Sequence, residues 1–210
     1  MCNTMALGGG VMKSLVLYSG LLKDDHYCLI KTMHDFDDFK KVIKVFSEDP
    51  YNEVLSDQDC IDEFDSYERN GFVIGGYVDG QIQGINCILN DVPEDYSINF
   101  VNPKRIAYYS GLAVLKNCQK NGLGWRLVTE TDRYIQELGK YDYSFARIRC
   151  FDSQSEGIFR KHGFIDAYQD EELIVDDVTY LRNTGVYDCD LRKYMVKKLI
   201  SSTDNSYYKR

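Results

Sequence analysis

The sequence is poor in proline, in histidine and in positive charge. Only three prolines stand against a 44% apolar content, a balance that excludes a largely disordered chain. The 25 Lys and Arg residues are outnumbered by 33 Asp and Glu residues, which leaves a formal charge of −8 and argues against binding to nucleic acid. We therefore expect an ordered protein, most simply a single domain, that acts on another kind of partner.

Long hydrophobic runs and metal-binding patterns are also missing. The longest uncharged apolar stretch near the start, Ser14 to Leu22, is far shorter than the roughly 20 residues that cross a bilayer, which predicts no membrane association. The seven cysteines never form a C-x-x-C pair, and none of the three histidines belongs to an H-x-x-x-H pattern. We expect no metal site, no disulfide framework, and the reduced thiols of a cytoplasmic protein.

The spacing of apolar residues predicts a mixture of strands and helices. Asp79-Gly80 between two β-type runs is the strongest hairpin signal, because both turn residues tolerate positive φ. Ser56 or Asp57 is the expected cap of the second helix, and Gly139 is expected to end the third. The expected strands are 27–30, 72–78, 81–89, 106–115, 144–150, 164–168 and 194–196, and the expected helices are 36–46, 56–67, 123–138 and 152–162.

This order of elements predicts an α/β fold of the mixed α+β kind, with a single mixed sheet. Residues 1–26 are expected to form an N-terminal leader or an extra strand, residues 27–200 the main domain, and residues 201–210 a polar tail. The acidic segment 166–177 and its continuation to residue 189 are poorly patterned. No element is predicted for most of that region.

A glycine-rich turn between a predicted strand and a predicted helix, Gln119-Lys120-Asn121-Gly122-Leu123-Gly124, is the most informative segment. Gly122 and Gly124 lack the Cβ atoms that would keep a bulky anion from the backbone, and the first helical turn adds unpaired N–H groups. Trp125-Arg126 stands where a P-loop needs Lys and Ser/Thr, and Leu127 where a dinucleotide motif needs a third glycine. We expect a cradle for phosphate or pyrophosphate; a turn that binds nothing is the alternative.

Two blocks of the sequence resemble motifs of the GNAT N-acetyltransferase superfamily. The run Leu112-Ala113-Val114, followed by Gln119-x-x-Gly122-x-Gly124, is similar to the acetyl-coenzyme A motif of that family. The block Asp152-x-x-Ser155-x-x-x-Phe159-x-x-x-Gly163-Phe164 resembles the family's N-x-x-A-x-x-x-Y-x-x-x-G-F. The resemblance implies a single mixed, mostly antiparallel central sheet flanked by helices. It also implies transfer of an acetyl group from acetyl-coenzyme A to an amine of a small molecule or peptide.

The resemblance further implies which residues hold acetyl-coenzyme A. The strand Leu112-Ala113-Val114 would offer backbone groups to the pantetheine arm and the acetyl carbonyl, Asp152 and Ser155 would meet the pantetheine, and Phe159 would lie beside the sulfur. The implied reaction is direct transfer in a ternary complex, without a covalent enzyme intermediate. The pyrophosphate would lie in the cradle formed by Gln119, Lys120, Asn121, Gly122, Leu123, Gly124 and Trp125.

Two positions depart from the family pattern. The usual general acid is a tyrosine, but Phe159 has no proton to give to the leaving thiolate. The strand before Leu112 usually carries a carboxylate that serves as the base, but Tyr108-Tyr109-Ser110-Gly111 contains none. The candidates for a substitute base are Tyr109 or Ser110 relaying through water, Asp152, and a carboxylate such as Asp166 or Glu171.

These departures leave more than one function open. The leading hypothesis is an acetyl-coenzyme A-dependent N-acetyltransferase. The alternatives are a catalytically weak or inactive acetyl-coenzyme A-binding module that acts as a sensor or scaffold, and an enzyme for longer acyl groups. The acidic net charge favours a cationic acceptor such as a polyamine or an aminoglycoside. A homodimer is one assembly that the chain could form.

Overall fold

The computed structural model describes residues 14–48, 54–93, 98–102, 104–149, 152–175, 180–181, 186–187 and 192–199. The helices are α1 (Phe36–Glu48), α2 (Asp57–Asn70), α3 (Leu123–Leu138) and α4 (Ser153–Lys161). The strands are β1 (Val16–Leu21), β2 (Tyr27–Met33), β3 (Gly71–Val78), β4 (Gln81–Leu89), β5 (Ile98–Phe100), β6 (Ile106–Val114), β7 (Tyr143–Arg149), β8 (Ile165–Asp166), β9 (Leu173–Val175), β10 (Tyr180–Leu181), β11 (Val186–Tyr187) and β12 (Arg192–Lys198). None of the helices within these ranges is long and apolar enough to span a bilayer.

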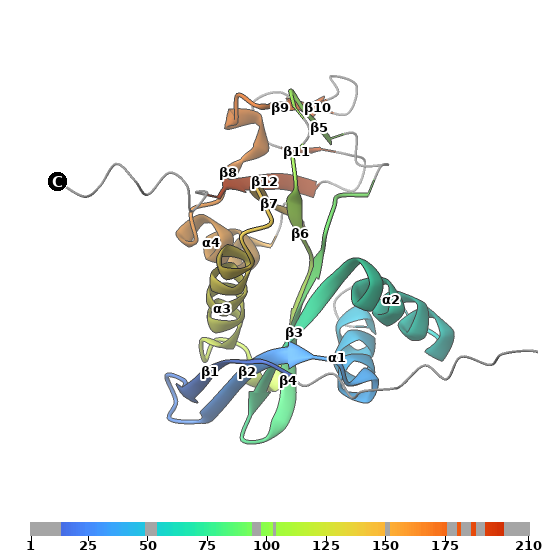
Figure 1. The fold of residues 1–210 in the computed structure, drawn as a ribbon. Coiled ribbons are helices and arrows are strands. Elements are labelled where there is room, and N and C mark those ends of the chain that lie inside the picture. Colours follow the sequence, from blue (N-terminus) through green and yellow to red (C-terminus); the bar gives the residue numbers. More distant parts are fainter. Residues whose placement is uncertain are drawn as a thin grey trace, which may run out of the picture.

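One large sheet carries the fold, with its strands in the order β1-β2-β3-β4-β6-β7-β12-β11-β10. Strands β6 and β7 are parallel, and the other pairs among the described strands are antiparallel. Helices α1 and α2 lie on one face of the sheet, and α3 and α4 lie on the other (Figure 1). The expectation of a mixed α/β fold with one mostly antiparallel sheet is confirmed.

Local sequence signals place the turns and helix ends. Asp79 and Gly80 form the hairpin turn with φ angles of 47° and 80°, as the Asp-Gly pair predicts. Ser56 caps α2 and accepts a hydrogen bond from the Asp59 backbone, while the Asp59 side chain accepts one from the Ser56 backbone. Gly139 ends α3 with a φ of 60°. The turn, the helix cap and the helix end thus lie where the sequence predicts them.

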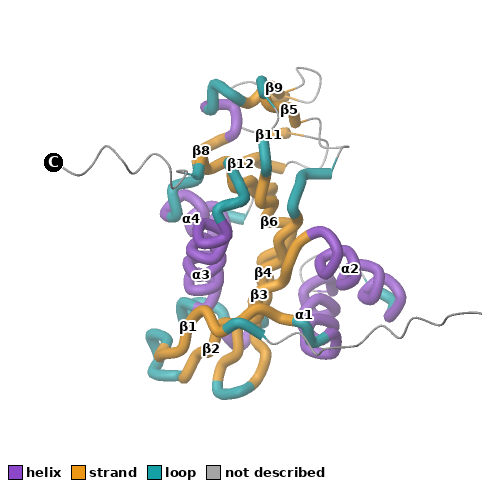
Figure 2. Tube along the Cα trace, viewed as in Figure 1, coloured by secondary structure: helices purple, strands orange, loops and turns teal. Residues whose placement is uncertain are grey.

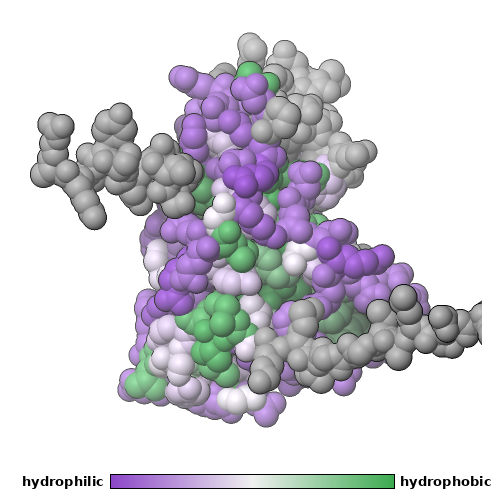
Figure 3. Space-filling view, viewed as in Figure 1, coloured by the Kyte–Doolittle hydropathy of each residue, from purple (hydrophilic) through white to green (hydrophobic). Residues whose placement is uncertain are grey.

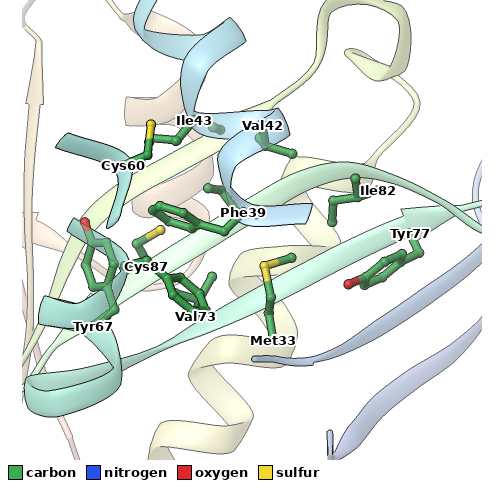
Figure 4. Close-up of a cluster of buried hydrophobic side chains, with 13 residues drawn as sticks. Met33, Phe39, Val42, Ile43, Cys60, Tyr67, Val73, Tyr77, Ile82 and Cys87 are labelled. Atoms are coloured by element: carbon green, nitrogen blue, oxygen red, sulfur yellow. The ribbon is translucent and has the colours of Figure 1, made fainter. Parts of the chain in front are cut away.

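The core on the α1 and α2 face fixes the position of α2 against the sheet. Phe39 of α1 reaches into the cluster near Val73 and Cys87 (Figure 4). Its ring centroid lies 5.0 Å from that of Phe64 and 5.9 Å from that of Tyr67, both on α2. Contacts between tilted aromatic rings stabilise such a cluster beyond the area that they bury. Tyr67 is therefore held firmly, with its ring in the core.

One strand is shorter than the sequence predicts, and one lies within the N-terminal segment. The strand expected over 164–168 is only the short β8, which passes into a 3-10 turn over Ala167–Gln169 (Figure 2). Residues 14–22 include β1, which pairs with β2 at the edge of the sheet. This edge exposes Val16 and Leu21. Figure 3 shows hydrophobic patches at the lower left of the molecule, among more polar residues, and a more hydrophilic surface around β12.

Candidate functional site

The parallel strands β6 and β7 separate along their length. Their shared register ends where Tyr109 lies opposite Ala146, although β6 continues to Val114 and β7 to Arg149. Two strands that separate leave backbone N–H and C=O groups along the gap without a partner strand, and such groups need other hydrogen-bond partners. The gap is therefore suited to bind an extended polar ligand.

A large cavity of about 760 Å³ opens beside this gap. Its volume lies within the range of about 300 to 1,000 Å³ that is usual for small-molecule and cofactor sites. The end of β6, the turn after it, the first turn of α3 and the N-terminal half of α4 form most of its walls. The lining residues are Lys23, Phe46, Leu112, Val114, Gln119, Lys120, Gly122, Gly124, Trp125, Asp152, Ser153, Gln154, Ser155, Gly157, Ile158 and Lys161.

The glycine-rich turn forms one end of this cavity. Gly122 has a φ of 100°, which favours glycine, and precedes the first residue of α3. The Asn121 side chain accepts a hydrogen bond from the Leu123 backbone, while the N–H groups of Gly124 and Trp125 belong to the first helical turn and have no acceptor within the helix. A Cβ at Gly124 would make only ordinary contacts, 3.5 Å from Ile158. The protein itself thus leaves space at Gly124, as the predicted cradle requires.

A lysine from the N-terminal hairpin closes the cradle. The Lys23 backbone N–H donates to the Asn121 carbonyl at 3.4 Å, and the Lys23 side-chain stem lies 3.8 to 4.0 Å from the position of a Cβ at Gly122. Lys120 and Lys161 line the same cavity. Three ammonium groups and a helix N-terminus make this end of the cavity attractive to phosphate. Sequence reasoning missed Lys23, because nothing near it in the sequence marks it as a neighbour of residues 119–124.

The N-terminus of α4 forms the opposite wall. The Asp152 carboxylate accepts hydrogen bonds from the Ser155 backbone N–H at 2.9 Å and from the Ser155 hydroxyl at 2.6 Å. Asp152 therefore caps α4 and fixes the Ser155 side chain at the cavity wall. Phe159 is buried on the next turn, and its ring packs edge to face against Tyr109 and Phe164.

A second, smaller cavity of about 90 Å³ adjoins the large one, since Phe46, Leu112, Asp152 and Ser155 line both. It lies between β6, β7 and α4 on the inner side of the gap. A ligand that enters along the large cavity would therefore end at the small one. The remaining lining residues are Tyr109, Ser110, Gly111, Arg147, Ile148, Arg149, Phe159 and Arg192.

Ser110 connects the small cavity to a carboxylate. Ser110 lies at a β-bulge, since Gly111 pairs with Cys87 and Tyr109 with Ile88. Its hydroxyl can donate to the Tyr67 hydroxyl at 3.0 Å or to the Cys87 carbonyl at 3.2 Å. Tyr67 in turn donates to Glu63 Oε1 at 3.1 Å. Neither Tyr67 nor Glu63 was among the sequence candidates.

Tyr109 belongs to a different, buried network. Its hydroxyl donates to Asp132 Oδ1 at 2.5 Å, and Lys197 donates to the other oxygen of Asp132 at 2.8 Å. Burial, together with the negative charge of Asp132, raises the pKa of Tyr109 well above its usual value. Tyr109 therefore stays protonated at neutral pH, with its proton already directed to Asp132. This geometry favours Ser110 over Tyr109 as a proton acceptor.

Most of the sequence candidates line one of the two cavities, and a few lie elsewhere. The small cavity is lined by Tyr109, Ser110 and Phe159. The large cavity is lined by Leu112, Val114, Gln119, Lys120, Gly122, Gly124, Trp125, Asp152 and Ser155. Ala113 and Leu123 are buried in the core instead. Asp166 forms an ion pair with Arg160 at 2.9 Å, and neither Asp166 nor Glu171 lines these cavities.

Comparisons with known proteins show which family the chain resembles in sequence and in fold. The model of a family described as the acetyltransferase (GNAT) family matches residues 36–164, more than half of the chain, whereas no curated protein sequence matches. A Staphylococcus aureus N-acetyltransferase structure is similar with a TM-score of 0.60 and 14% identity, covering 82% of this chain and 99% of that one. The structure of a ribosomal-protein-alanine N-acetyltransferase from Brucella melitensis is similar with a TM-score of 0.58 and 16% sequence identity, covering 81% of this chain and 99% of that one. The structure of a Bacillus subtilis acetyltransferase in complex with CoA is similar with a TM-score of 0.52 and 18% sequence identity, covering 81% of this chain and 98% of that one.

The fold and the family match together define an acyl-transferring enzyme. The chain belongs to the GNAT family of acetyltransferases. The site residues fit its acyl donor, because a large cavity, a cradle with room beside Gly124 and three lysines suit a large anionic molecule such as coenzyme A.

Proposed function

We propose that this chain is an acetyl-coenzyme A-dependent N-acetyltransferase that moves the acetyl group directly to an amine of a small molecule or peptide. The observation that carries the proposal is the pair of adjoining cavities beside the gap between β6 and β7. One is large and lined by three lysines, and the other is small and polar. Residues 27–200 form the catalytic domain in this proposal, with β1 as an added edge strand.

The donor occupies the large cavity. Its pyrophosphate takes the cradle, with the N–H groups of Gly124 and Trp125 and the lysines as partners. Its pantetheine arm runs along the free edge of β6 at Leu112 and Val114, opposite Asp152 and Ser155 on α4. The thioester then lies near Phe159, at the junction with the small cavity. A backbone N–H on the unpaired part of β6 stabilises the carbonyl oxygen as negative charge develops on it.

The acceptor amine enters the small cavity beside Ser110. An ammonium must lose a proton before it can attack, and its proton passes to Ser110 Oγ. In the same step the Ser110 proton moves to the Tyr67 hydroxyl and the Tyr67 proton moves to the Glu63 carboxylate. Burial raises the pKa of Tyr67 well above its usual value, but Tyr67 passes a proton on without ever becoming an anion. The relay therefore supplies the base that β6 itself lacks.

The amine nitrogen then forms a bond to the acetyl carbon, and the carbon–sulfur bond breaks. Coenzyme A leaves as a thiolate, which is tolerable without an acid because a thiol has a pKa of about 8.5. Phe159 gives no proton at this step, and its buried ring lines the small cavity instead. Slow leaving-group departure is the expected consequence.

Calorimetric titration with acetyl-coenzyme A tests the donor site, with Gly124→Trp as the blocked variant. The Trp side chain projects toward Ile158 and Val114, where a Cβ still fits, so the variant should fold while the cavity is filled. We expect saturable binding that Gly124→Trp removes. A folded wild-type protein that fails to bind acetyl-coenzyme A would end the proposal.

The absence of an acid at Phe159 supports a second candidate, an acetyl-coenzyme A-binding sensor or scaffold with little or no turnover. Release of coenzyme A in the presence of a broad panel of amines separates the two. Turnover of any amine excludes the sensor, whereas tight binding without turnover, unchanged in Phe159→Tyr, would favour it.

A further inference from the structure

Trp125 is an exposed aromatic residue on the wall of the large cavity. It stands directly after Gly124 in the first turn of α3 and lines the cavity there. The residue remains 40% exposed, although it carries the largest apolar side chain of all. The proposed donor site uses only the backbone N–H of Trp125 and gives the indole ring no role. A large aromatic ring left exposed inside a cavity is well placed to cover a flat part of a ligand.

The indole ring contacts a neighbouring ring that is itself held in place. The ring centroids of Trp125 and His162 lie 4.0 Å apart, with an angle of 41° between the planes. The His162 Nδ1 atom donates to the Ile158 carbonyl at 2.9 Å, and its Nε2 atom lies 3.0 Å from the Thr129 hydroxyl. That hydroxyl donates to the Trp125 carbonyl at 2.9 Å. Because these contacts restrict the indole before any ligand binds, little further entropy is lost when a ligand covers its exposed part.

The wall that α4 contributes to the same cavity leaves free space. Gln154, Gly157, Ile158 and Lys161 line the cavity, and their spacing puts them on one face of the helix. A glycine in a helix interior is destabilising relative to alanine, and a Cβ at Gly157 would meet nothing within 4 Å. Packing within the described structure therefore gives no reason for a glycine there. The wall combines an apolar side chain, an ammonium group and room for a ligand.

The place of Trp125 beside the phosphate cradle indicates which part of the donor can reach it. In coenzyme A the pyrophosphate joins the pantetheine arm to an adenosine. In the proposed donor site the arm runs from the cradle along β6 toward the small cavity, which Trp125 does not line. The adenosine is thus the part that remains for Trp125. Aromatic side chains hold bases by stacking, without any need for hydrogen bonds to the base.

We propose that Trp125 is the platform on which the adenine ring of the donor stacks. This contact selects an acyl group carried by free coenzyme A over the same acyl group on a phosphopantetheine arm that lacks the nucleotide. The inference rests on the proposed function and names the donor class of the same site. Thioester and pantetheine are identical in the two kinds of donor, so only the nucleotide end distinguishes them.

Fluorescence of the full-length protein tests the stacking directly. Trp125 is the one tryptophan of the chain, so selective excitation of tryptophan reports on this side chain alone. The probes are coenzyme A, adenosine 3′,5′-bisphosphate, phosphopantetheine and inorganic pyrophosphate. A purine that stacks on an indole ring quenches its emission. We expect saturable quenching by the first two probes, which carry adenine, and much weaker quenching by the last two.

Trp125→Leu and Trp125→Phe separate stacking from the simple bulk of the side chain. Leucine is apolar and a good helix former but has no aromatic face. Calorimetry should therefore show coenzyme A binding weakened about tenfold or more in Trp125→Leu, with phosphopantetheine binding unchanged. Phenylalanine keeps a face for adenine, so Trp125→Phe should retain most of the affinity for coenzyme A.

Leu138→Ala is the matched control. Leu138 is the last residue of α3, is 38% exposed and lines neither cavity. It is thus a similarly exposed apolar residue at the other end of the same helix. Its replacement should change neither the affinity for coenzyme A nor the quenching.

The outcomes separate this inference from the proposed function. Equal weakening of coenzyme A and phosphopantetheine binding in Trp125→Leu would overturn the adenine platform and leave the acetyltransferase proposal standing. A Trp125→Phe variant as weak as Trp125→Leu, or coenzyme A binding to the wild type without quenching, would have the same meaning. Quenching by pyrophosphate as strong as that by coenzyme A would also contradict stacking. If the wild type binds no coenzyme A, the proposed function itself fails, and this inference fails with it.

Discussion

Replacement of Tyr67 by phenylalanine is the sharpest test of the proposed proton relay. Tyr67 receives the Ser110 proton and passes its own to Glu63, over distances of 3.0 Å and 3.1 Å. Phenylalanine keeps the ring that packs against Phe39 and removes only the hydroxyl. The variant therefore interrupts the relay in its middle and leaves both cavity linings in place.

The size of the effect follows from the protonation of the acceptor. An alkyl amine with a pKa of about 10 is neutral in about one molecule per thousand at pH 7. A positioned base contributes about 10²- to 10⁴-fold to such reactions. We expect kcat/KM to fall about 10²- to 10³-fold at pH 7. The deficit should shrink about tenfold for each pH unit as the amine loses its proton in solution, so that most of it has disappeared by pH 9.

The assay follows coenzyme A release between pH 6 and 9 with one acceptor, for the wild type and the variant. Tyr141→Phe is the matched control, because the Tyr141 hydroxyl also donates one hydrogen bond, to Asn90 at 2.6 Å, but lines neither cavity. Both variants should lose about 1 kcal/mol or somewhat more of stability, and only Tyr67→Phe should lose pH-dependent activity. An equal deficit at every pH, or no deficit, would refute the relay.

Three further predictions concern binding and stability. Lys23→Gln should weaken acetyl-coenzyme A binding several-fold in calorimetry, because Lys23 lies over the cradle, and the loss should be smaller at high salt. Asp132→Ala should lower the free energy of unfolding in urea by about 3 kcal/mol or more, since it leaves Lys197 without its buried partner. Arg105 lowers the pKa of Asp142 to about 2. The contribution of this ion pair to the free energy of unfolding is therefore complete above about pH 4 and is lost as the pH falls toward 2. In Arg105→Gln the urea midpoint of unfolding should lose the pH dependence that this ion pair causes, and the midpoints of the variant and the wild type should converge at low pH.

Local signals in the sequence predicted much of the fold. The Asp79-Gly80 turn, the Ser56 cap and the Gly139 stop depend on side chains and φ angles within a few residues, so the sequence is enough to recognise them. The short β8 was misjudged, because a strand of two residues exists only through its pairing with β12. Its length depends on a partner that is distant in the chain.

The local structure of the proposed donor side was predictable in the same way. Residues from 112 to 124 form one strand, one turn and the start of one helix, so the cradle is a local structure. The large cavity includes most of the residues that the motif named. Lys23 was not predicted, since it reaches the cradle only through the turn between β1 and β2, which pair at the edge of the sheet.

The acceptor side was decided by the tertiary structure. The sequence alone shows Ser110 only as a serine on a strand. Its connection to Tyr67 and Glu63 depends on the position of α2, whose residues stand more than 40 positions earlier in the chain. Arg149 and Arg192 become neighbours only through the register of β7 and β12. Sequence by itself determined the family, the glycine-rich turn and the strand that we propose carries the donor, because these are encoded by adjacent residues. Only the folded chain could bring together the residues of the proposed base relay and the three arginines of the small cavity, because these residues are distant in the sequence and meet only in the tertiary structure.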